Sequence, residues 1–169
     1  MTLPESPRDD FITRLRSSWK RALPEVDTSP VELLGRITRI SALSIQQLDR
    51  VLVSSGISRS EFDVLCALAR SDRPLRASEV TAETMLSGAA TTKLTSRLEA
   101  IGLILRQRLE RDGRVVLLQL TDAGRNLVET EFPRCVAHDR ELLAGLDDSE
   151  QRVLASLLQR ISANAESSR

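Results

Sequence analysis

The stretch RQRLERDGRVVLLQLTDAG, residues 106–124, decides the fold because it combines a hairpin signal with a dense run of arginines. Asp112 and Gly113 stand between two apolar runs, and an Asp-Gly pair in that setting predicts a two-residue β-hairpin turn. We expect the strands to cover residues 103–109 and 115–120. A hairpin alone needs only the turn, so the arginines around it point to a negatively charged partner.

The arginines of this hairpin are spaced so that they can reach a polyanion. Side chains alternate along a strand, so Arg106 and Arg108 share one face of the first strand. Arg111 and Arg114 bracket the predicted turn, and Asp112 is placed to orient Arg114. Because a guanidinium keeps its charge and suits a narrow minor groove, we predict that the four arginines contact DNA. Asp112 is included in this DNA-binding set as the residue that orients Arg114. Ion pairs with the hairpin's own acidic residues are the alternative explanation.

The composition is that of a globular protein with a local excess of positive charge. The chain has 169 residues, of which 41% are hydrophobic and 28% charged, and its 24 basic residues balance 24 acidic ones. Between residues 85 and 118, however, six basic residues face only three acidic ones. The total therefore excludes a protein that coats polyanions over its whole surface, whereas the local excess fits one DNA-binding face.

The chain before the hairpin predicts five helices from apolar residues spaced three or four apart. They are expected over residues 10–22, 31–53, 58–73, 78–84 and 87–101. Ser58 and Glu61 match a capping box at a helix start, and Gly102 stands where a C-terminal glycine belongs. On the fifth helix, Leu94, Leu98 and Ile101 are predicted to face the core.

Two further helices are predicted after the hairpin. Thr121 is expected to cap a helix that runs to about residue 143 and contains Pro133, and Asp147 with Glu150 caps a last helix. An apolar stripe follows on that helix at Val153, Leu154, Leu157, Leu158 and Ile161. The order helix, helix, helix, β-hairpin predicts a mainly α protein with a winged helix-turn-helix, flanked by helices at both termini.

The fifth helix is the candidate recognition helix. Such a helix carries polar groups on the face that points away from its core. The predicted outward residues that contact DNA are Thr91, Thr92, Lys93, Thr95, Ser96 and Arg97. Gly88 and the alanines after it leave the helix N-terminus open to a phosphate. A solvated helix face explains the same residues nearly as well, and the arginine-rich hairpin favours DNA.

Three stretches of this sequence resemble the MarR family of bacterial transcriptional regulators. They are FDVLCALARS (62–71), SGAATTKLTSRLEAIGLI (87–104) and RDGRVVLLQLTDAGRNLVE (111–129). The resemblance covers residues 31–161, and its most specific part is the D-x-R element at 112–114 followed by L-T-x-x-G at 120–124.

The resemblance implies one MarR-like domain over residues 1–169 that acts as a cytoplasmic homodimer. Residues 10–56 and 121–163 would supply the dimerisation helices, and residues 57–120 the DNA-binding lobe. Two such lobes would read a palindromic operator, with recognition helices about one DNA turn (~34 Å) apart. The family's habit is repression that a small, often aromatic or phenolic, anion relieves, with no resident cofactor.

The N-terminal helix resembles that of a subfamily that includes urate-responsive members. In that subfamily a tryptophan of the added helix, an aspartate and a recognition-helix arginine contribute to the ligand response. Trp19 and Asp63 match the first two and are candidate ligand-binding residues. Leu94 stands at the arginine position, which argues against urate itself because a buried anion would lose its charge partner. Packing of the added helix is the competing role for Trp19.

The remaining reactive residues predict neither an enzyme nor a metal site. Cys66 lies on an apolar stripe, and two distant cysteines do not form a disulfide framework. Cys135 and His138 are three residues apart on a predicted helix, but two ligands do not make a metal site. A redox- or metal-responsive regulator and a winged-helix module that binds proteins instead of DNA are the alternatives. Neither a signal peptide nor a membrane-spanning run is recognisable, so we expect a cytosolic protein.

Overall fold

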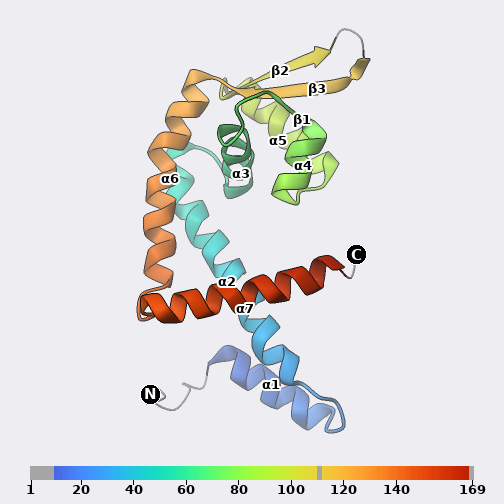
Figure 1. Ribbon diagram of the computed structural model, residues 1–169, viewed down its shortest axis with the longest axis vertical. Helices are drawn as coiled ribbons and strands as arrows, with labels where there is room; N and C mark the ends of the chain where they lie inside the picture. The colour runs from blue at the N-terminus through green and yellow to red at the C-terminus, as the bar shows by residue number, and fades with distance from the viewer. Residues whose placement is uncertain (1–9, 110–111, 168–169) are drawn as a thin grey trace. The chain divides into compact units, whose positions relative to one another are not determined.

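The computed structural model describes residues 10–109 and 112–167, and for residues 108, 109 and 112–114 it describes the backbone only (Figure 1). The elements in chain order are α1 (Phe11–Ala22), α2 (Ser29–Leu52), the 3-10 turn η1 (Val53–Ser55), α3 (Arg59–Ala69), β1 (Leu75–Arg76), α4 (Ala77–Thr84), α5 (Gly88–Ala100), β2 (Ile104–Leu109), β3 (Asp112–Leu120), α6 (Asp122–Leu142) and α7 (Asp148–Ser167). They fall into two compact units, Met1–Arg50 and Val51–Arg169.

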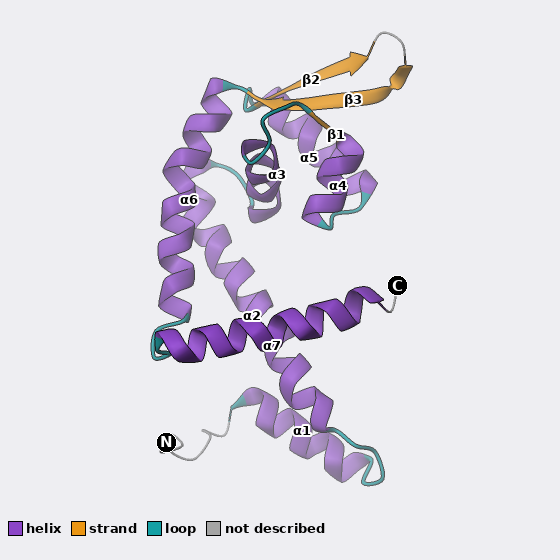
Figure 2. Ribbon diagram, in the orientation of Figure 1, coloured by secondary structure: helices purple, strands orange, loops and turns teal. Residues whose placement is uncertain are grey.

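The second unit contains the predicted winged helix-turn-helix. It combines helices α3, α4 and α5 with a three-stranded antiparallel sheet of strand order β1-β3-β2, in which β1 lies between α3 and α4 in the chain (Figure 2). The two-residue strand β1, which pairs Leu75 with Leu118, was not expected from the sequence. None of the helices in the described ranges is long and apolar enough to span a bilayer. The predicted fold class is confirmed.

One aliphatic core joins these helices to the sheet. Leu65 of α3, Val80 of α4, Leu98 of α5, Ile104 of β2 and Leu118 of β3 are all at most 1% exposed. Each comes from a different element, so burying them together fixes how the helix-turn-helix sits on its wing. Removal of this much aliphatic surface from water stabilises the unit.

Strand β3 begins earlier than the sequence indicated. Leu109 pairs with Asp112, so Asp112 and Gly113 belong to β3, and the predicted Asp-Gly turn is wrong. The linking residues 110–111 lie outside the described ranges. The register between β2 and β3 is set by buried pairs at the other end of the strands, such as Ile104 opposite Leu120. An irregularity in the pairing between Arg108 and Leu109 shifts this register toward the end of β2.

The base of the wing is joined to α6 through the L-T-x-x-G element. The Thr121 hydroxyl accepts a hydrogen bond from Gly124 N (3.0 Å), which caps α6, and donates to the Gly102 carbonyl (2.8 Å). Thr121 N donates to the Leu103 carbonyl (3.1 Å). Gly102 itself ends the recognition helix with φ +77°, a backbone conformation that favours glycine. Threonine and glycine are therefore required here by local geometry.

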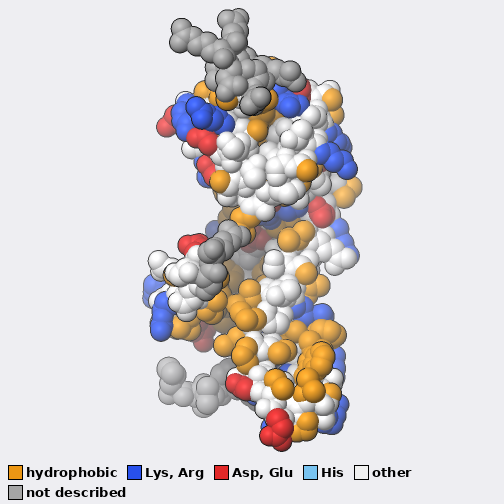
Figure 3. Space-filling view, turned by 90° about the vertical axis from the view of Figure 1, so that its right-hand side faces the viewer, with side chains coloured by type: hydrophobic (Ala, Val, Ile, Leu, Met, Phe, Trp, Pro, Cys, Tyr) orange, Lys and Arg blue, Asp and Glu red, His pale blue; other side chains and the backbone are white. Residues whose placement is uncertain are grey.

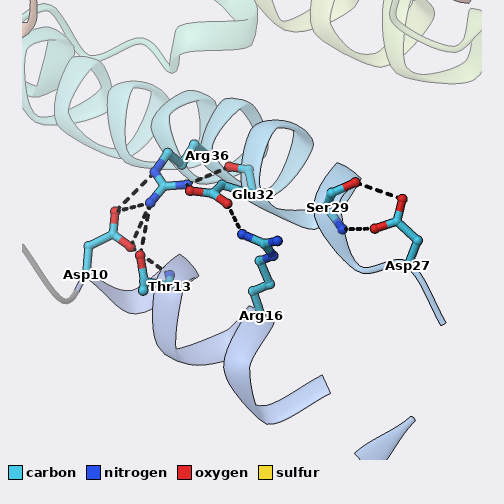
Figure 4. Close-up of polar contacts among 7 residues, drawn as sticks. All are labelled: Asp10, Thr13, Arg16, Asp27, Ser29, Glu32 and Arg36. Carbon is cyan, nitrogen blue, oxygen red and sulfur yellow. Dashed lines mark hydrogen bonds and ion pairs between the residues drawn. The ribbon is translucent and has the colours of Figure 1, made fainter. Parts of the chain in front are cut away.

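In the first unit, α1 is clamped onto α2. Ile12 is 3% exposed and packs where a Cβ on Gly35 would lie 3.3 Å from its Cδ1. A polar cluster borders this contact (Figure 4). The Arg36 guanidinium donates hydrogen bonds to the Asp10 carboxylate (3.2 Å) and to the Thr13 hydroxyl (3.1 Å). Arg16 and Glu32 form a second ion pair between the helices. The apolar contact of Ile12 with Gly35 and the polar contacts of Arg36 and Arg16 together hold α1 on α2.

Large apolar side chains remain exposed on several helices. The stripe on α7 runs from Val153 to Ile161, and its five members are 36–58% exposed. On α2, Leu33, Leu34 and Ile40 are more than half exposed. Figure 3 shows hydrophobic side chains gathered over α1 and α2. Exposure on this scale marks an interaction surface and is more than isolated surface residues produce.

Candidate nucleic-acid interface

The recognition helix α5 is fixed to α4 by a hydroxyl contact and a tight turn. The Thr81 hydroxyl lies 2.9 Å from that of Thr91. Met85 ends α4 in the left-handed region (φ 54°), and Ser87 begins α5 by accepting from Ala90 N at 3.2 Å. The turn therefore leaves the N-terminus of α5, at Gly88, exposed to solvent.

Two of the six predicted contact residues on α5 face the core and not solvent. Thr91 and Thr95 are each 1% exposed, so their predicted outward position is wrong. Each hydroxyl donates to the carbonyl one turn earlier, Thr95 to Thr91 O at 2.8 Å, which satisfies the polar group inside the core. The buried stripe is therefore Thr91, Thr95 and Leu98. Ile101, predicted to be buried, is 47% exposed.

The outward face of α5 has three small or polar residues around the cation Lys93. Ala89, Thr92, Lys93 and Ser96 are exposed, and the Arg97 side chain is also 51% exposed. Within the described residues, Lys93 has no ion-pair partner, and a Cβ at Gly88 would meet nothing within 4 Å. A face with small residues, an available ammonium and unobstructed helix N–H groups can approach a phosphate closely.

Arg97 is turned back toward the protein. Its guanidinium forms an ion pair with Glu61 of α3 and donates to the Gly56 carbonyl at 3.1 Å. Glu61 is 3% exposed. Burial tends to raise the pKa of this carboxyl, but hydrogen bonds from Ser58 and Arg97 outweigh it, so its pKa lies below the ordinary value. From the sequence, Glu61 was predicted only as a capping residue of α3.

Arg106 connects the wing to α5. Its Nη1 lies 2.5 Å from the Ser96 hydroxyl and 3.4 Å from a Glu99 carboxylate oxygen, and its side chain is 20% exposed. Within the described part of the chain, its buried Nε has no hydrogen-bond partner. The side chains of the other predicted wing residues, Arg108, Arg111, Asp112 and Arg114, lie outside the described residues.

Comparison with known proteins places this helix-turn-helix and wing in a family. A model of the MarR family matches residues 55–115. The HTH-type transcriptional regulator PecS of Dickeya dadantii (strain 3937) is 30% identical over 152 residues, which are 89% of this chain and 92% of PecS. The chain belongs to the MarR family. The resemblance drawn from the sequence is confirmed.

Solved structures of MarR regulators have the same fold. BpsR of Bordetella bronchiseptica, whose DNA binding is regulated by 6-hydroxynicotinic acid, is 26% identical, with a TM-score of 0.64 over 75% of this chain and 98% of BpsR. The apo form of MarR from E. coli is also 26% identical, with a TM-score of 0.63 over 76% of this chain and 95% of MarR.

The two ligand candidates of this MarR chain lie in different units. Trp19 of α1 is 47% exposed, whereas Ile12 of the same helix is buried at 3% exposed. Asp63 of α3 forms an ion pair with Arg59, whose Nε lies 2.8 Å from Asp63 Oδ1. Leu94, at the subfamily's arginine position, is half-buried on α5.

Both cysteines of this MarR chain are buried thiols. Burial, followed by the nearby Asp63 carboxylate, raises the pKa of Cys66 to about 11, and burial also raises the pKa of Cys135. His138 lies 4.0 Å from Glu141. Over residues 10–109 and 112–167, no three His, Cys, Asp or Glu side chains are grouped to hold a metal ion.

Proposed function

We propose that this chain is a sequence-specific DNA-binding transcriptional regulator that inserts α5 into the major groove. The observation that carries this proposal is the exposed face of α5, where Thr92, Lys93 and Ser96 follow an open helix N-terminus at Gly88. Thr and Ser reach phosphates or base edges, and lysine reaches guanine acceptors. The wing arginines 108, 111 and 114 would enter the adjacent minor groove. Such a regulator works in the bacterial cytoplasm and is not an enzyme.

The regulator acts as a homodimer. Support comes from the exposed apolar stripe of α7 and from an open apolar groove of about 590 Å³ between α1 and α2, which Phe11, Leu34 and Leu43 help to line. Water contact with this much apolar surface is unfavourable, and a second copy covers it symmetrically. Twofold symmetry presents two recognition helices to a palindromic operator.

A small aromatic or phenolic anion releases the operator and relieves repression. The regulation of BpsR by 6-hydroxynicotinic acid supports a ligand of this class. The ligand must have a higher affinity for the conformation that does not bind DNA than for the conformation that does. Linkage then weakens DNA binding by the same factor. Trp19 and Asp63 are the candidate contacts.

The salt dependence of duplex binding tests the DNA assignment. Wild-type affinity should fall steeply with salt, and Lys93→Ala should lower the slope of log K against log salt by about 0.9, one phosphate contact. Lys20→Ala is the matched control because it removes the chain's other lysine, on α1. Equal effects of the two substitutions would contradict a DNA-facing α5.

A further inference from the structure

The side chain of Arg97 lies on the recognition helix, but its polar contacts lie elsewhere. One nitrogen pairs with Glu61 at the start of α3, and the other donates to the Gly56 carbonyl at 3.1 Å. Gly56 (φ +68°) follows η1 and so ends the segment that leaves α2. Arg97 therefore bonds α5 to both sides of the connection between α2 and α3.

The Glu61 carboxylate forms contacts with two elements, the start of α3 and the Arg97 side chain of α5. Its Oε2 accepts from Ser58 N (2.8 Å) and from the Ser58 hydroxyl (2.9 Å), which caps α3, while its Oε1 receives Arg97. The carboxylate is 3% exposed, and a buried charge is tolerated only when it is paired and hydrogen-bonded. The cap and the ion pair consequently depend on each other.

The same connection is also tied to α6. The Ser55 hydroxyl donates to Glu131 Oε1 at 2.7 Å, and Glu131 is 4% exposed with Arg134 beside it at 3.0 Å. A second buried carboxylate thus holds the connection from the opposite helix. The backbone between η1 and α3 is fixed by one carboxylate toward α5 and another toward α6.

We propose that Arg97 is a positioning residue of the recognition helix and does not itself contact DNA. It sets the orientation of α5 relative to the end of α2, so that a change in the connection at Gly56 is transmitted to the DNA-reading face. This inference rests on the proposed DNA-binding function. It removes Arg97 from the set of predicted DNA contacts and assigns Glu61 as its partner.

A double-mutant cycle with salt titrations tests the assignment. Operator affinity of Arg97→Gln, Glu61→Gln and the double variant is measured by fluorescence anisotropy at several salt concentrations. We expect each single variant to weaken binding about tenfold and the double variant to weaken it no further, because the two residues act as one unit. The salt slope should stay at the wild-type value, since no phosphate contact is lost.

Arg97→Lys and Lys93→Ala complete the experiment. Arg97→Lys keeps a positive charge opposite Glu61 but does not reproduce the second contact, with the Gly56 carbonyl, so it should weaken binding less than Arg97→Gln does. It is the variant to measure if the glutamine variants do not fold. Lys93→Ala should lower the salt slope. A reduced slope in Arg97→Gln, together with full affinity in Glu61→Gln, would overturn the assignment. Full affinity in both glutamine variants would also overturn it, whereas a wild-type chain that binds no duplex would refute the proposed function instead.

Discussion

Gly124 in the first turn of α6 sits directly against the carbonyl of Leu103 at the base of the wing. A Cβ at residue 124 would lie 2.1 Å from the Leu103 oxygen, a distance that no methyl group can occupy. The same oxygen accepts the hydrogen bond from Thr121 N at 3.1 Å. The join between the wing and α6 therefore depends on a missing side chain.

Gly124→Ala should destabilise the fold, because the backbone of α6 or of Leu103 must move to relieve the clash. We expect a loss of about 1–3 kcal/mol in the free energy of unfolding, measured by urea denaturation. Gly88→Ala is the matched control, since a Cβ there meets nothing within 4 Å, and it should change stability by less than about 0.5 kcal/mol. Equal stabilities of the two variants would contradict the close approach.

The stabilisation that the Glu61 carboxylate provides should disappear in acid. Its pKa in the folded state is lower than in the unfolded chain, so its contribution is present above the unfolded-state pKa and is lost as the pH falls through the folded-state pKa. Glu61→Gln should therefore be less stable than wild type at pH 7, by about 1–3 kcal/mol, and this difference should shrink as the pH falls below the ordinary pKa of a glutamate. A difference that is constant with pH would show that Glu61 is not ionised in the fold.

The apolar stripe of α7 should be needed for dimer formation. Leu157 is 48% exposed in the single chain, and Leu157→Asp would place a charge in the proposed interface. We expect a loss of about 2 kcal/mol or more in association energy and a shift toward monomer in light scattering at micromolar concentration. Gln159→Asp, on the opposite face of α7, should leave the mass at twice that of one chain. A dimeric Leu157→Asp variant would place the interface elsewhere.

Cys66 should be unreactive in the native protein. With a pKa of about 11, only about 0.1% of the thiol is ionised at pH 8, and the side chain is buried. Thiol titration with a disulfide reagent should be slow for both cysteines until denaturant is added. Rapid native labelling, accompanied by a change in DNA affinity, would favour an oxidant-responsive regulator.

Local signals in the sequence predicted most of the secondary structure. The capping box of Ser58 and Glu61, the helix start at Thr121 and the helix end at Gly102 each depend on residues within four positions, and all three are present. The winged helix-turn-helix followed from their order. Such features are predictable because they require no knowledge of distant contacts.

The candidate site was predicted less well because its contacts are long-range or depend on register. Thr91 and Thr95 look like surface residues by polarity, yet each hydroxyl bonds its own helix and is buried. The ion pair between Arg97 and Glu61 spans 36 residues, which no local pattern reveals. The wing turn was misplaced because distant strand pairs fix the register, and the Asp-Gly signal does not.

Selection of bound duplexes from a random pool, with the purified chain at moderate salt, tests the central claim most directly. A dimeric MarR regulator should enrich a palindrome whose half-sites are about one helical turn apart. Lys93→Ala should bind that palindrome more weakly. A folded dimer that enriches no sequence would contradict the account and favour a winged-helix module that binds another protein.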